Sequence, residues 1–276
     1  MSYAQNMEDV VLCRLVERVP HGRFIDVGAG HPTLENVTYA LYLNGWRGIN
    51  VEPMQAEVAL LRAQRPADET VQAAVGATAG SVTLYEAPAS ANRGATTSNA
   101  ELAARYASAD GATFVAFESP MVTLSSLLAK FEPGAVHVLK IDVEGMEFDA
   151  LTGADLQLHR PWVVVVESTE PNEPTSTAHL WDHILTTAGY CLALFDGLNG
   201  FYVRSDLEEV AALLSVPANV FDRWVSARTV ELRQEVAELR VSFAEAQGYA
   251  QALENVLADL RTETASQRKP FGRTKS

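Results

Sequence analysis

The feature that most constrains the fold is a regular alternation of short apolar runs with helix-like stretches along residues 23–203. Several runs are almost wholly apolar, which is typical of strands covered on both faces. The alternation predicts an α/β fold with a parallel, doubly wound sheet. A short Asp-Gly-Leu-Asn-Gly connection predicts that the last two strands form an antiparallel hairpin. The predicted strands are 24–27, 48–51, 71–75, 136–141, 162–166, 190–195 and 201–203. The predicted helices are 38–44, 55–64, 124–131, 147–152 and 179–188.

Charge and cysteine content narrow the function classes. The 276-residue chain has a formal net charge of −14 and a pI near 4.8, so we expect no nucleic-acid partner. Its two cysteines, Cys13 and Cys191, are far apart, which suits a reducing compartment. The sequence has no signal peptide and no apolar run of about 18 residues. These features predict a cytoplasmic protein without a transmembrane segment.

The stretch 89–114 interrupts the alternation and is rich in Ala, Ser, Thr, Gly and Asn. We expect a mobile insertion with one short helix at 99–106. Two interpretations stay open, a plain surface loop and a lid over the functional site.

A different pattern begins after Trp224. Apolar or small residues recur in steps of four and three from Val225 to Leu260, which indicates a coiled-coil helix. We therefore expect a globular domain over 1–222, a coiled-coil helix over 223–264 and a basic disordered tail over 265–276. The seam favours a homo-oligomer over a helix that folds back on the domain. The mixed side-chain sizes leave the number and direction of the helices open.

The stretch "FIDVGAGH" at 24–31 predicts a strand followed by a tight ligand-binding turn. Asp26 precedes the turn, and Glu52 ends the next strand, where it can accept hydrogen bonds from a ribose. The third glycine of a dinucleotide-binding turn is missing, which favours S-adenosylmethionine over NAD. Asn36 and Thr38 are expected near the methionine end of the cofactor. The predicted cofactor-binding residues are Asp26, Gly28, Ala29, Gly30, Asn36, Thr38, Glu52, Pro53 and Ala74.

Six blocks in order resemble the FkbM-type methyltransferase family. They are "YAQNMEDVVL" (3–12), "IDVGAGHP" (25–32), "GWRGINVEP" (45–53), "LKIDVEGMEFDAL" (139–151), "VVESTEP" (165–171) and "FDGLNGFYV" (195–203). The resemblance implies a Rossmann-like class I methyltransferase with seven strands and an antiparallel hairpin at one edge. It also implies S-adenosylmethionine-dependent O-methylation, commonly of a sugar or polyketide hydroxyl, and suggests bacterial surface glycans as the setting. The N-terminal block is expected to fold over the cofactor, with Gln5 and Glu8 as secondary candidates.

Acidic residues at strand ends are the candidates for chemistry. Asp142 and Glu167 are the predicted catalytic residues, and either one acts as a general base or both hold a divalent cation such as Mg²⁺. Lys140 is expected to pair with an acid, and His183 to pack on an amphipathic helix. Glu144 and Gly145 are expected to shape the turn after Asp142.

Other functions stay open at this point. The runner-up acceptors are lipid and polyketide hydroxyls. A non-catalytic coiled-coil scaffold with a degenerate fold is a different class, and NAD-dependent oxidoreduction is a third.

Overall fold

The structure is a computed structural model that describes the chain except for residues 87–95, 99, 102, 105–113, 171–173 and 268–276. It contains two compact units, Met1–Trp224 and Val225–Ser276. Within the described residues, no helix has both the length and the apolar character needed to cross a membrane.

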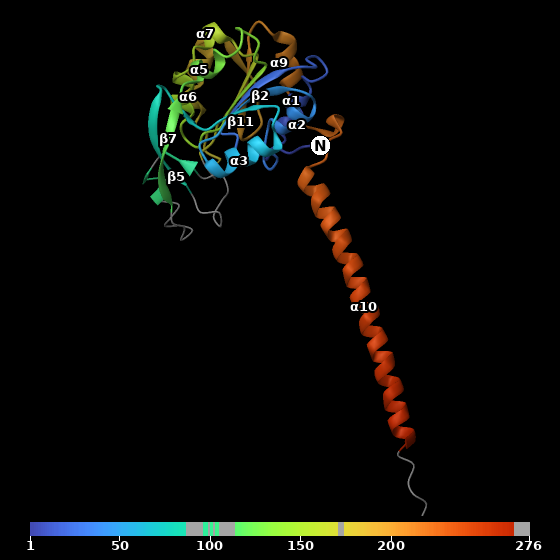
Figure 1. Ribbon diagram of the computed structural model, residues 1–276. Helices are drawn as coiled ribbons and strands as arrows, with labels where there is room; N and C mark the ends of the chain where they lie inside the picture. The colour runs from blue at the N-terminus through green and yellow to red at the C-terminus, as the bar shows by residue number, and fades with distance from the viewer. Residues whose placement is uncertain (87–95, 99, 102, 105–113, 171–173, 268–276) are drawn as a thin grey trace, which may run out of the picture. The chain divides into compact units, whose positions relative to one another are not determined.

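A seven-stranded sheet forms the centre of the first unit, with the strand order β10-β11-β9-β8-β1-β2-β3 (Figure 1). All neighbouring strands are parallel except β11, which runs antiparallel to both β9 and β10. The predicted α/β class, the mostly parallel sheet and the edge hairpin are therefore confirmed. The strands are β1 (Arg23–Val27), β2 (Arg47–Val51), β3 (Glu69–Val71), β8 (Val138–Ile141), β9 (Val163–Glu167), β10 (Tyr190–Phe195) and β11 (Asn199–Arg204).

Helices cover both faces of this sheet. Successive strand residues point to opposite sides, so the strands place apolar side chains on both faces, and the helices bury them. In β1, Ile25 and Val27 join the core on one face, and Phe24 joins the core on the other. One face packs against α5 (Leu124–Leu128), α6 (Glu147–Thr152), α7 (Leu156–His159) and α8 (Asp182–Thr187). The other packs against α1 (Glu8–Cys13), α2 (Tyr39–Leu43) and α9 (Glu208–Leu214). The helix α3 (Gln55–Gln64) follows β2, and η1 (Ala178–Leu180) and η2 (Val220–Asp222) are short 3₁₀ turns.

A second, four-stranded sheet was not predicted. Its order is β4-β7-β5-β6, with β4 (Ala74–Val75), β5 (Gly80–Glu86), β6 (Thr96–Thr97) and β7 (Val115–Val122). The predicted single strand at 71–75 is wrong, because β3 belongs to the large sheet and β4 to the small one. Most of the predicted insertion at 89–114 falls outside the described residues. Of its predicted helix at 99–106, residues 100, 101, 103 and 104 are described, and all four are helical.

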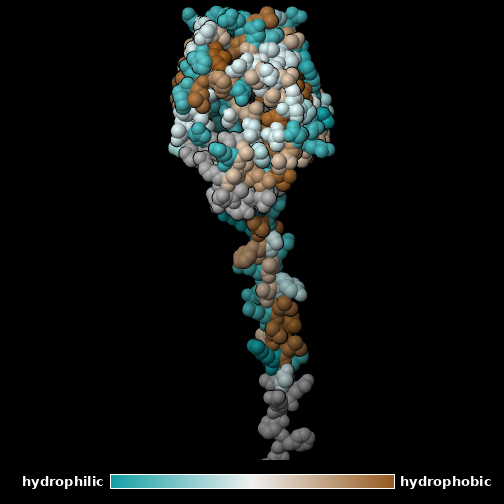
Figure 2. Space-filling view, turned by 90° about the vertical axis from the view of Figure 1, so that its left-hand side faces the viewer, coloured by the Kyte–Doolittle hydropathy of each residue, from teal (hydrophilic) through white to brown (hydrophobic). Residues whose placement is uncertain are grey.

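In the part of the second unit that the structure describes, there is one helix, α10 (Ala227–Gln267), of 41 residues. It extends past residue 264, where the helix was predicted to end. Every residue from 231 to 264 is exposed. Figure 2 shows apolar side chains along its surface. The exposed large apolar side chains of α10 include Leu232, Val236, Leu239, Phe243, Leu253, Leu257 and Leu260.

Candidate functional site

Acidic residues from four neighbouring strands lie at one edge of the large sheet. Parallel strands bring their carboxyl ends to the same edge, and ligands in such sheets bind there. Asp26 lies in β1, Glu52 follows β2, Asp142 follows β8 and Glu167 ends β9. The topology therefore brings together the four acids that the sequence placed at strand ends.

The glycine turn after β1 is held between its two neighbouring strands. The amides of Gly28 and Ala29 both donate to the carbonyl of Val51. Gly28 has φ +70°, and a Cβ on it would lie 1.7 Å from the carbonyl oxygen of Asp142. Only glycine fits this position. Gly30 also has a positive φ of +54°, but a Cβ there would meet no atom within 4 Å.

Lys140 is the cation at the centre of this edge. Its Nζ donates to the carbonyl of Gly28 at 2.8 Å and lies 3.2 Å from Asp142 and 3.5 Å from Asp26. Burial lowers the pKa of Lys140, but Asp142 and Asp26 outweigh burial and raise it above its usual value. The predicted pairing of Lys140 with an acid is confirmed, and the ammonium joins the turn to the ends of β1 and β8.

Buried polar side chains form hydrogen bonds with β1 and with the glycine turn. Thr38 Oγ1 donates to Asp26 at 2.6 Å, and Asn36 Nδ2 donates to the carbonyl of Ala29 at 2.9 Å. Arg65 donates to both Asn36 and Thr38, and it forms an ion pair with Asp68 that is fully buried. The side chains of Asn36 and Thr38 are thus engaged with protein atoms, so their geometry fits positioning of the turn. Their predicted cofactor contacts stay predictions.

Sequence reasoning missed Arg65. It follows α3 in a polar stretch that resembles an ordinary exposed helix end, so the local pattern carries no signal for its burial. Its exposed fraction is 0%, because the guanidinium lies over the ring of Phe24 in β1 and donates hydrogen bonds to Asn36 and Thr38.

Glu52 lies beside the glycine turn. Its two carboxylate oxygens accept the amides of Gly30 and Met54, each at 2.9 Å. Burial raises the pKa of Glu52 to about 7, although these hydrogen bonds act in the opposite direction. Pro53, the next residue, is partly exposed. Ala74 instead packs in the core of the second sheet with Leu84 and Met146, so its cofactor contact remains a prediction.

Three carboxylates lie close together at the carboxyl ends of β8 and β9. Asp142, Glu144 and Glu167 each place one oxygen so that the three lie within 4.8 Å of one another. Burial raises the pKa of Glu167, and Asp142 and Glu144 raise it further. Burial and Asp142 also raise the pKa of Glu144. At neutral pH this group, which we name the carboxylate trio, can hold a proton or a cation.

The loop between β8 and α6 positions the third member of the trio. Glu147 accepts the amides of Val143 and Gly145, each at 3.2 Å, and closes the loop. Glu144 is thereby held at φ +52°, and its carbonyl accepts a hydrogen bond from Thr97 of the second sheet. The sequence placed Glu144 in this turn. Its position in the trio follows from the left-handed backbone, which the sequence did not predict.

The N-terminal segment joins the glycine turn to the β10–β11 hairpin. The carbonyl of Tyr3 accepts the amide of Asn36, and its ring packs edge-on against Tyr39 at 4.7 Å. Glu8 accepts a hydrogen bond from Asn199 at 2.7 Å, and burial raises its pKa to about 7. Gln5 is exposed.

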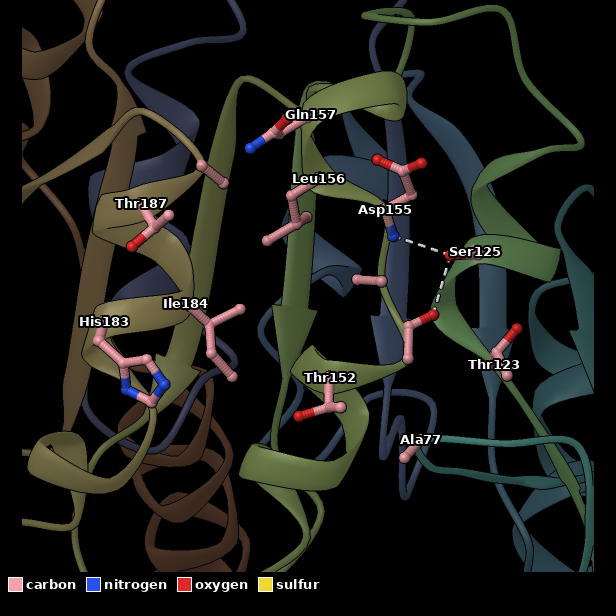
Figure 3. A pocket seen from close by; sticks show the side chains of 13 residues that line it. Ala77, Thr123, Ser125, Thr152, Asp155, Leu156, Gln157, His183, Ile184 and Thr187 are labelled. Carbon is pink, nitrogen blue, oxygen red and sulfur yellow. Dashed lines mark hydrogen bonds between the residues drawn. The ribbon is translucent and has the colours of Figure 1, made fainter.

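A separate hollow of about 670 Å³ lies among α5, α7 and α8 (Figure 3). Ser125, Asp155 and His183 are among its lining residues. His183 was predicted to pack, but its side chain is exposed at the rim of this hollow. None of the trio residues lines it, so the hollow and the carboxylate trio are separate features, and the trio stays the candidate site.

The structure is an α/β fold with a glycine turn after β1 and acidic groups at the carboxyl ends of the strands. The sequence matches the methyltransferase FkbM domain over residues 26–192. The chain belongs to this family, and membership supports methylation that depends on S-adenosylmethionine.

Solved structures of low similarity were also found. One is a TehB-like SAM-dependent methyltransferase from Corynebacterium glutamicum, with 9% identity, a TM-score of 0.37, and coverage of 71% of this chain and 87% of that one. Another is the CurJ carbon methyltransferase, with 10% identity, a TM-score of 0.40, and coverage of 74% of this chain and 56% of that one. A comparison with curated proteins gave no match.

Proposed function

We propose that this chain transfers a methyl group from S-adenosylmethionine to a hydroxyl group of a sugar in a bacterial surface glycan. The observation that carries the proposal is the carboxylate trio beside the glycine turn, where it can receive a hydroxyl proton. The glycan acceptor rests on the family resemblance. Lipid and polyketide hydroxyls are the alternative acceptors.

The residues around the turn fit the cofactor. Glu52 is buried and accepts the amide of Gly30. A Cβ on Gly30 would meet no atom within 4 Å, so the space beside this residue is open and a ribose can approach the carboxylate. Asp26 Oδ1 is buried and accepts no hydrogen bond among the described residues. Acids of this kind suit a cationic amino group and ribose hydroxyls better than a pyrophosphate. When bound, S-adenosylmethionine supplies an electrophilic methyl carbon.

The trio supplies the base. A hydroxyl is a poor nucleophile until its proton is removed, and a positioned carboxylate contributes about 10²–10⁴-fold to such a step. We assign the base to Asp142, whose carboxylate is paired with the ammonium of Lys140. Glu167 and Glu144, whose pKa values are raised, stay protonated beside Asp142 and do not compete for the hydroxyl proton.

The same three oxygens are also chemically suited to Mg²⁺, which prefers carboxylate ligands. In that alternative the trio holds the cation, and the acceptor hydroxyl is polarised instead of being deprotonated by Asp142 alone. A chelator separates the two possibilities, because only the metal-dependent reaction would stop.

The first test is calorimetric titration with S-adenosylmethionine, with and without EDTA. We expect micromolar binding. Absence of binding would contradict the enzyme proposal and favour a non-catalytic scaffold, and binding of NADH instead would favour oxidoreduction.

The second test uses Asp142→Asn and transfer of a labelled methyl group to a panel of glycan, lipid and polyketide acceptors. We expect turnover to fall at least about 100-fold, with the cofactor Kd changed less than about threefold. Asp149→Asn, on the exposed side of α6, is the matched control and should retain full turnover. Unchanged turnover in Asp142→Asn would remove Asp142 from the mechanism.

A further inference from the structure

The helix α10 carries an apolar seam whose side chains differ greatly in size. In a heptad written abcdefg, Leu239 and Ala246 take d positions, and Phe243 and Ala250 take a positions. Leu239 is 69% exposed and Phe243 is 65% exposed. An exposed seam of this length on one helix is typical of an interaction surface.

The sizes of the side chains at the a and d positions determine how a second copy of α10 can pack on this seam. In a parallel pair, each residue faces its own counterpart. Phe243 would then face the partner's Phe243, and Ala246 and Ala250 would each face alanine. One crowded layer would be followed by two underpacked layers, and interiors tolerate neither well.

An antiparallel pair places a positions opposite d positions and evens out these layers. When the twofold axis lies between residues 243 and 246, Phe243 faces the partner's Ala246, and Leu239 faces the partner's Ala250. Each large side chain therefore meets a small one. The remaining layers pair Val236 with the partner's Leu253, Leu232 with the partner's Leu257, and Thr229 with the partner's Leu260.

The charges beside the seam favour the same arrangement. In this antiparallel register Arg233 faces the partner's Glu254, and Arg228 faces the partner's Glu263. Twofold symmetry makes each pair occur twice, and no two like charges face each other. In a parallel pair Arg228 would instead face the partner's Arg233, and this repulsion would oppose one favourable pair between Glu235 and the partner's Arg240.

The neighbouring antiparallel registers are worse. A shift by one heptad in one direction brings Arg240 against the partner's Arg240. A shift in the other direction brings Arg233 against the partner's Arg261 and Ala246 against the partner's Ala250. Size and charge, which are independent features of the sequence, thus select one register.

We propose that α10 forms an antiparallel coiled coil with a second copy of this chain, centred between Phe243 and Ala246. The partner is identified by complementarity of the helix with itself under a twofold rotation. The two helix N-termini lie at opposite ends of the pair.

Disulfide crosslinking of the full-length chain tests direction and register. The exposed Cys191 is replaced by serine, while burial raises the pKa of Cys13 to about 12 and keeps that thiol unreactive. In the double variant Val236→Cys/Leu253→Cys, we expect a covalent dimer with disulfides between positions 236 and 253. These positions are about 25 Å apart on one helix, so the bond must join two chains.

Each single variant is the control. Alone, Val236→Cys and Leu253→Cys should not crosslink, and a mixture of the two should form the mixed disulfide. Self-crosslinking of either single variant would show a parallel pair and overturn the proposal. A monomer in analytical ultracentrifugation, or a dimer without the 236–253 disulfide, would overturn it as well.

A charge exchange gives a second, independent test. Arg233→Glu should weaken the dimer at least about fivefold at low salt, because it faces the partner's Glu254 twice. Adding Glu254→Arg should restore the original affinity. Failure of the double variant to recover would exclude this pairing. Dimerisation is measured without cofactor or acceptor, so the outcome does not depend on the proposed methyl transfer.

Discussion

At the scale of single residues, the site is defined by an excess of buried acid over base. Lys140 contacts Asp26 and Asp142, but Glu144 and Glu167 lie within the same small region. One ammonium cannot offset all these carboxylates at short range in a partly buried site. Burial raises the pKa values of Glu144 and Glu167, and the excess of acid raises them further, so both groups retain protons.

Glu167 should therefore make stability depend on pH. Its pKa in the folded state lies above the value in the unfolded chain, so its stabilising contribution is complete at low pH and is lost as pH rises. Glu167→Gln keeps the neutral form at every pH. We expect the free energy of unfolding of the variant, relative to the parent, to increase by on the order of 1 kcal/mol from about pH 6 to pH 8.

Urea unfolding at the two pH values measures this difference. Glu118→Gln is the control, since Glu118 is exposed and its hydrogen bonds to Thr83 and Ser81 lower its pKa. Its effect should be the same at both pH values. A difference for Glu167→Gln that is constant or shrinks with pH would show that Glu167 is charged in the folded protein.

The acids of the site could be predicted from the sequence, but their supporting residues could not. Asp26 lies near the end of an apolar run, and Glu52, Asp142 and Glu167 each follow or end one, and the parallel sheet aligns those ends. Asn36 and Thr38 were predicted as cofactor contacts and not as supports of the turn. Arg65 contacts both from a distant segment, so no local pattern marks it. Glu144 joins the trio through a left-handed backbone conformation that Glu147 stabilises.

At the scale of elements, the turn after β1 depends on two glycines for different reasons. Gly28 lies against the carbonyl of Asp142, whereas Gly30 has open space around it. Gly28→Ala should push β1 and β8 apart, and we expect an unfolded protein or a cofactor Kd raised more than about 100-fold. Gly30→Ala should cost only about 1–2 kcal/mol of stability, from its positive φ.

Thermal unfolding and cofactor titration of both variants measure the contrast. Equal effects of the two substitutions would mean that backbone conformation matters here and that the close approach of Asp142 does not.

The sequence did not predict the small sheet or the helices α7 and α9. In β5, only Leu84 is buried, and Thr and Ser alternate with apolar residues along a largely exposed strand. Continuous apolar runs mark strands that are covered on both faces, as in the large sheet, and a sheet with one exposed face lacks such runs. Strands β5 and β7 pair directly along residues 80–86, so their stability comes from a partner distant in sequence.

At the scale of the whole molecule, the two units differ in what holds them together. The buried clusters of the first unit contain no residue beyond Ala218. A chain that ends at Trp224 should therefore fold, with a Tm within about 5 °C of the full-length protein and an unchanged cofactor Kd. Scanning calorimetry and cofactor titration check this, and aggregation of the shortened chain would contradict it.

The contact between Glu8 and Asn199 links the beginning of the domain to its last hairpin across 191 positions of sequence. A ribosome that adds about 5–20 residues per second needs roughly 10–40 s to cover that span. During this time the N-terminal segment has left the ribosome, but the β10–β11 hairpin that it contacts has not yet been made. The cofactor turn, which Tyr3 braces through Asn36, thus reaches its final form late in synthesis, after the strands that carry the acids have been made.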